Sequence, residues 1–108
     1  MFTPDFNKKF DEIDGLILEK ENIRNYDESS AILFSALKLG EEYGELSESI
    51  LTFLGHQREE KIKDFKKADL GEEIADVLIQ TMVLGRRLDI DVKSAVSKKL
   101  EKIKNRLQ

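Results

Sequence analysis

Two short tracts of this sequence carry closely spaced carboxylates inside apolar, helix-like surroundings. Residues 39–45 read Leu-Gly-Glu-Glu-Tyr-Gly-Glu and residues 70–76 read Leu-Gly-Glu-Glu-Ile-Ala-Asp, so each tract has acids three positions apart. Residues three apart share one face of a helix, and like charges placed there repel one another unless a positive group lies between them. If antiparallel helices bring the tracts together, the acids form an all-oxygen site for a hard cation such as Mg²⁺. The spacing therefore predicts metal chemistry as well as helical structure.

Four helical segments are expected to position these tracts. Apolar periodicity and capping residues place them at residues 4–21, 29–54, 67–88 and 92–107. Thr3, either Ser29 or Ser30, and Asp91 suit the N-caps of the first, second and last segments. Gly55 is typical of the residue that follows a helix C-terminus.

The fold expected from these segments is all-α. No part of the chain shows the alternation of a strand, and residues 22–29 and 56–66 are polar connections. The second connection contains the only histidine, His56, for which a surface position is expected. At 108 residues the chain is predicted to form one domain, residues 1–108, a four-helix bundle with an antiparallel central pair.

Helical wheels predict which side each acid takes. The second segment has an apolar face consisting of Ile32, Ala36, Leu39, Tyr43, Leu46, Ile50, Phe53 and Leu54. Glu42 and Glu45 lie on one shoulder of that face, and Glu41 lies farther round. The third segment is apolar around most of its circumference, with Glu73 and Asp76 in its main polar gap. A helix of this kind is normally buried, and one small bundle offers too little cover, so a homodimer or homotetramer is expected.

The last segment is basic. Its apolar stripe consists of Val92, Val96, Leu100, Ile103 and Leu107. Lys99 and Arg106 lie on the shoulder of this stripe and Lys102 a little farther out. Cations beside an acidic cleft suit phosphate groups that are also bound to a metal ion.

Composition excludes several classes of site. The chain has no cysteine, so it has no disulfide, thiolate metal site or cysteine nucleophile. A net charge of −4 gives no reason to expect a nucleic-acid polymer as partner. No secretory signal is visible, and no apolar run approaches the ~20 residues of a membrane span. A cytoplasmic protein without membrane contact is therefore expected.

The acidic pattern resembles a known signature. Glu41-Glu42-x-x-Glu45, followed after 27 residues by Glu73-x-x-Asp76, is similar to the motif of the all-α nucleoside triphosphate pyrophosphohydrolases, which include MazG, the dimeric dUTPases and MazG-like proteins. The resemblance extends over roughly residues 30 to 106. Members of the family often have an asparagine at the place of Ile103, and this chain departs from them there.

The resemblance implies a reaction and a set of roles. Family members hydrolyse an NTP or dNTP between the α and β phosphates and release a nucleoside monophosphate and pyrophosphate, often as nucleotide housecleaning. Carried over to this sequence, the ligands of Mg²⁺, for which Mn²⁺ is a possible substitute, would be Glu42, Glu45, Glu73 and Asp76. Glu41 would orient or deprotonate the attacking water, and the phosphates would contact Lys99, Lys102 and Arg106.

Two other functions stay open from the sequence. One is a non-catalytic helical module that self-associates and keeps a metal site or only its outline. The other is a pyrophosphatase that acts on a diphosphate without a nucleoside. Turnover of a nucleotide panel separates the first of these from the enzyme.

Overall fold

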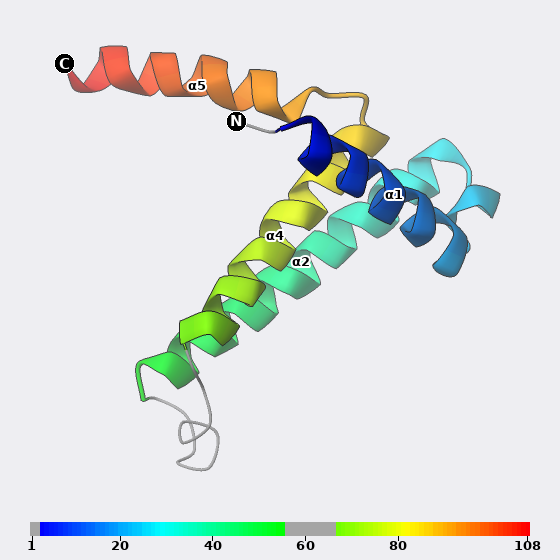
Figure 1. Cartoon of the computed structure of the whole chain (residues 1–108), viewed down its shortest axis with the longest axis horizontal. Coiled ribbons are helices and arrows are strands. Elements are labelled where there is room, and N and C mark those ends of the chain that lie inside the picture. Colours follow the sequence, from blue (N-terminus) through cyan, green and yellow to red (C-terminus); the bar gives the residue numbers. More distant parts are fainter. Residues whose placement is uncertain (1–2, 56–66) are drawn as a thin grey trace. The chain divides into compact units, whose positions relative to one another are not determined.

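The described part of the chain is helical. The structure, a computed structural model, describes residues 3–55 and 67–108, and Figure 1 shows their arrangement. The elements are α1 (Pro4–Lys20), the short 3₁₀ helix η1 (Ile23–Asn25), α2 (Glu28–Phe53), α4 (Lys67–Arg87) and α5 (Val92–Leu107). Within the described ranges there is no strand, so the all-α expectation is confirmed. The predicted connection with His56 lies outside the described residues. None of the described helices is long and apolar enough to cross a membrane.

Side-chain caps define where the helices begin. Thr3 accepts a hydrogen bond from the Phe6 amide at 3.1 Å, and Asp91 caps α5 at 3.0 Å, as predicted. The prediction for α2 was wrong, because its cap is Asp27 and neither Ser29 nor Ser30.

The carboxylate of Asp27 begins α2 earlier than expected. It accepts a 2.7 Å hydrogen bond from the Ser30 amide, and the same interaction lowers the pKa of Asp27. Both serines therefore lie inside the first turn of the helix. At the other end the predicted stop is confirmed, since Gly55 has a φ of 81° that suits glycine.

The chain divides into two compact units, residues 1–32 with 85–108 and residues 33–84. In the second unit α2 and α4 run antiparallel, side by side (Figure 1), as the sequence predicted for the central pair. The buried side chains of this unit are small or medium-sized: Ser35, Thr52 and Val83.

The predicted apolar face of α2 is only partly covered, since Ile32, Leu39 and Leu46 are half-buried. Tyr43, Ile50, Phe53 and Leu54 are exposed, and on α4 so are Ile74 and Leu78. The most buried residues of α2 are the small polar Ser35 and Thr52.

In the first unit an ion pair joins α1 to the end of α4. The Arg87 guanidinium donates to both carboxylate oxygens of Asp14, at 2.7 and 3.1 Å. Asp14 is buried on α1 together with Phe10. Arg86 forms a 2.7 Å ion pair with Asp11, and its guanidinium carbon lies 4.6 Å from the centroid of the Phe10 ring. Ion pairs and the contact between Arg86 and Phe10 therefore both join α1 to the end of α4.

The turn from α4 to α5 depends on a glycine. The Gly85 carbonyl accepts a 2.8 Å hydrogen bond from the Ile90 amide, and Asp89 in the same turn has a positive φ of 56°. A Cβ atom added to Gly85 would collide with the Val92 side chain. The tight connection therefore needs a residue without a side chain at this position.

Candidate metal centre

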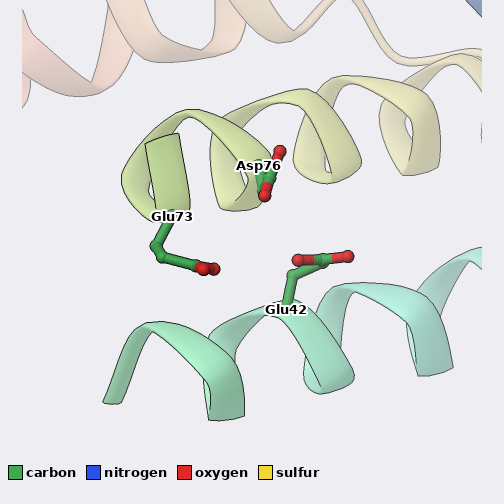
Figure 2. Close-up of side chains that lie close together, drawn as sticks. All are labelled: Glu42, Glu73 and Asp76. Carbon is green, nitrogen blue, oxygen red and sulfur yellow. The ribbon is translucent and has the colours of Figure 1, made fainter. Parts of the chain in front are cut away.

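Three carboxylates from the two acidic tracts meet between α2 and α4. Glu42 comes from α2, and Glu73 and Asp76 come from successive turns of α4 (Figure 2). Each offers one oxygen, and these oxygens all lie within 4.8 Å of one another. Glu73 and Asp76 share a face because they are three residues apart, and the antiparallel pairing places Glu42 opposite them.

The environment of these acids disfavours their negative charge. Glu42 and Glu73 are half-buried, and Oε2 of each is buried without a hydrogen-bond partner among the described residues. Burial raises the pKa of both carboxyls, and the charges of Glu45 and Asp76 raise it further. An unpaired buried carboxylate costs free energy unless a positive group approaches it. The group therefore has the electrostatics of a cation site.

The other two predicted acids lie outside the group of three. Glu45 is one turn beyond Glu42, and its charge acts on both Glu42 and Glu73. Glu41 forms a 3.4 Å ion pair with Lys38, and its side chain is 55% exposed. The structure thus couples Glu45 electrostatically to the group and pairs the exposed Glu41 with Lys38.

A residue that the sequence reasoning missed is Lys38. Its charge lowers the pKa of Glu42, against the effect of the neighbouring acids. The signal was present in the sequence, because Lys38 precedes Glu41 by three residues and Glu42 by four, both of which are helix-face spacings.

The predicted phosphate-binding residues lie on α5. Lys99, Lys102 and Arg106 are all exposed, and they belong to the unit that contains residues 85–108. Their role stays a prediction.

The similarity of this chain to protein families and known proteins adds to the geometry of the site. The MazG-like family matches residues 41–108, which include both α4 and α5 and the second half of α2. Neither the curated proteins nor the solved structures give a significant match. The family match covers more than half of the chain and includes all three grouped acids. The chain therefore belongs to the MazG-like family.

Proposed function

We propose that this protein hydrolyses nucleoside triphosphates, ribo or deoxy, between the α and β phosphates in an Mg²⁺-dependent reaction that clears unwanted nucleotides. The observation that carries the proposal is the meeting of Glu42, Glu73 and Asp76, two of which have an oxygen without a hydrogen-bond partner. Membership of the MazG-like family supports the same class of reaction.

The donor set fits a hard divalent cation. All the candidate ligands are carboxylates, with neither a histidine nor a thiolate among them, and such sets favour Mg²⁺ or Mn²⁺ over Zn²⁺. Each Mg²⁺–oxygen bond is about 2.1 Å, so oxygens that share one ion lie roughly 3–4 Å apart. Oxygens already within 4.8 Å of one another need only small side-chain movements to reach that spacing. Glu42, Glu73 and Asp76 would hold the ion, with Glu45 as a fourth ligand. Bound Mg²⁺ would neutralise charge on the substrate phosphates.

The remaining roles fall to side chains beside the acids and on α5. Glu41 would orient the attacking water and accept its proton, and Lys38 forms an ion pair with this carboxylate. Water adds to one phosphorus of the α–β linkage, the bond from that phosphorus to the bridging oxygen breaks, and a nucleoside monophosphate and pyrophosphate are released. Lys99, Lys102 and Arg106 would contact the phosphates. Apolar side chains exposed on α2 and α4 support the further proposal that the protein works as a homodimer or homotetramer.

The test is turnover of a panel of NTPs, dNTPs and damaged nucleotides with Mg²⁺, with pyrophosphate and orthophosphate measured separately. We expect pyrophosphate with the wild type and none with Glu42→Gln. Glu72→Gln is the matched control, because Glu72 is an exposed neighbour of Glu73 outside the group of three. It should stay active. Absence of turnover across the panel would favour a binding module, and orthophosphate as the product would exclude cleavage between the α and β phosphates.

A further inference from the structure

The two ends of the α2–α4 pair differ in charge on either side of the candidate metal centre. Glu42 lies across from Asp76 (Figure 2), and the helices run antiparallel, so lower numbers on α2 come opposite higher numbers on α4. Residues 43–53 and 67–75, which we call the acidic side, contain four acids besides Glu73: Glu45, Glu48, Asp69 and Glu72. Residues 33–40 and 77–84 contain no acid and one cation, Lys38, and we call them the Lys38 side.

Lys38 is placed to act on the metal centre. It precedes Glu42 by four residues, so both lie on one face of α2, and the α4 residue one turn beyond Asp76 is the uncharged, half-buried Gln80. The positive charge of Lys38 lowers the pKa of Glu42. The Lys38 side chain is 30% exposed, so a molecule in solvent can reach its ammonium group.

The ion pair that Lys38 forms with Glu41 is easily exchanged. Its 3.4 Å distance is longer than the about 2.7–2.9 Å of a strong charge-assisted hydrogen bond. The Glu41 side chain is 55% exposed, and an exposed ion pair contributes little free energy. A divalent cation held by the nearby acids would also repel the ammonium group from them. A phosphate oxygen of a bound substrate would then be the replacement partner.

The difference in charge gives a triphosphate a preferred direction. The β and γ phosphates carry most of the negative charge of a nucleoside triphosphate, and the sugar and base at the other end carry none at neutral pH. Carboxylates of the acidic side repel the β and γ phosphates, whereas the ammonium group of Lys38 attracts them. The end of the substrate that bears the nucleoside is therefore the end that tolerates the acidic side.

We propose that Lys38 binds the β and γ phosphates, so that the substrate lies along the α2–α4 pair with its terminal phosphate on the Lys38 side and its nucleoside toward the acidic side. The inference rests on the proposed hydrolysis of nucleoside triphosphates and adds the direction of the substrate to it. Lys38 is thereby a substrate-binding residue, and its ion pair with Glu41 belongs to the protein without substrate.

Binding of inorganic pyrophosphate in the presence of Mg²⁺ tests this assignment without turnover. In isothermal titration, Lys38→Met should weaken pyrophosphate binding about tenfold or more, because a charge-assisted contact is lost, and Lys38→Arg should retain it. Mg²⁺ alone should bind Lys38→Met at least as tightly as the wild type, since a repelling charge is removed. Weaker binding of Mg²⁺ alone to Lys38→Met would mean that Lys38 organises the acids, and would overturn the proposal.

Lys67→Met is the matched control. Lys67 is an exposed cation of the acidic side, and its removal changes the net charge by the same amount. This variant should bind pyrophosphate within about twofold of the wild type, and circular dichroism should give equal helicity for all the proteins. Equal weakening by Lys38→Met and Lys67→Met would reduce the effect to net charge and overturn the proposal. Absence of pyrophosphate binding by the wild type would overturn it too.

Steady-state kinetics separate a phosphate contact from an effect through Glu41. With a triphosphate that the wild type hydrolyses, Lys38→Met should raise KM about tenfold or more and leave kcat nearly unchanged. A lower kcat with an unchanged KM would mean that Lys38 acts through Glu41, and would overturn the proposal. If the wild type hydrolyses no nucleotide, the proposed function fails, and the pyrophosphate titrations still decide whether Lys38 binds a diphosphate. Turnover by the wild type with equal KM for Lys38→Met would overturn this inference alone.

Discussion

Removal of the Asp14 carboxylate should be among the most destabilising single changes in this protein. In the ion pair with Arg87 the side chains are only 4% and 9% exposed, and two hydrogen bonds of 2.7 and 3.1 Å join them. Asp14→Ala leaves the guanidinium buried without its carboxylate. Nε of Arg87 already has no hydrogen-bond partner in the described part of the chain, so no existing contact compensates.

The expected cost follows from this burial. Removal of one member of a buried ion pair costs about 3–5 kcal/mol, because the remaining charge is left desolvated. A small domain has only about 5–15 kcal/mol of stability in total. For a chain of this length the corresponding decrease in Tm is on the order of 10–20 °C. Because the pair connects α1 to the end of α4, α1 should also lose protection from hydrogen exchange.

Asp11→Ala is the matched control. The ion pair between Asp11 and Arg86 is equally short, at 2.7 Å, but their side chains are 62% and 42% exposed. An exposed pair contributes about 0–1 kcal/mol. Urea unfolding followed by circular dichroism should therefore separate the two variants by several kcal/mol. Asp14→Leu combined with Arg87→Met should recover most of the loss, since both charges are then absent. If Asp14→Ala and Asp11→Ala unfold at the same urea concentration, the reasoning from burial is refuted.

Three further predictions concern the turn, the candidate metal centre and a cap. Gly85→Ala should cost about 1–3 kcal/mol in urea unfolding because its Cβ collides with the Val92 side chain, and an unchanged midpoint would contradict this. The pKa values of Glu42 and Glu73 are raised above their ordinary value of 4.5 in the folded protein. This shift stabilises the folded protein at a pH below 4.5, and the stabilisation is lost as the pH rises through the raised pKa. Without metal ions, Glu42→Gln should therefore have a higher Tm than the wild type at pH 7 but not at pH 4, and Mg²⁺ should raise the Tm of the wild type only. Asp91→Ala should cost about 1 kcal/mol through loss of the α5 cap, measured by thermal unfolding.

The helices and most of their ends were predictable because local interactions determine them. Thr3, Asp91 and Gly55 each act through backbone groups within a few residues, and the sequence contains all the partners. The start of α2 was predicted wrongly because Asp27 and two serines compete for the same cap. All three residue types are good caps, and local sequence does not rank them.

The candidate site was predictable in part. The i, i+3 spacing identified both acidic pairs, since the helical period alone places each pair on one face. Which acids meet depends on how α2 and α4 pack. Glu42 joins Glu73 and Asp76 in the group of three, while Glu45 is left outside it. A helical wheel shows the direction of each side chain around the axis of one helix. It carries no information on the distance between side chains of two helices.

The apolar faces were the least predictable part, and α2 shows the physical cause. The most buried residues of α2 are Ser35 and Thr52, while Leu39 and Leu46 are half-buried, and the candidate metal ligand Glu42 is half-buried as well. Leu33, Leu37 and Leu51 are instead exposed, and a Cβ atom added to Gly40 or Gly44 would meet no atom within 4 Å. A helix that keeps carboxylates between itself and its neighbour gives up apolar contact area there. The exposed leucines of α2 are thus the observation on which the proposed self-association rests.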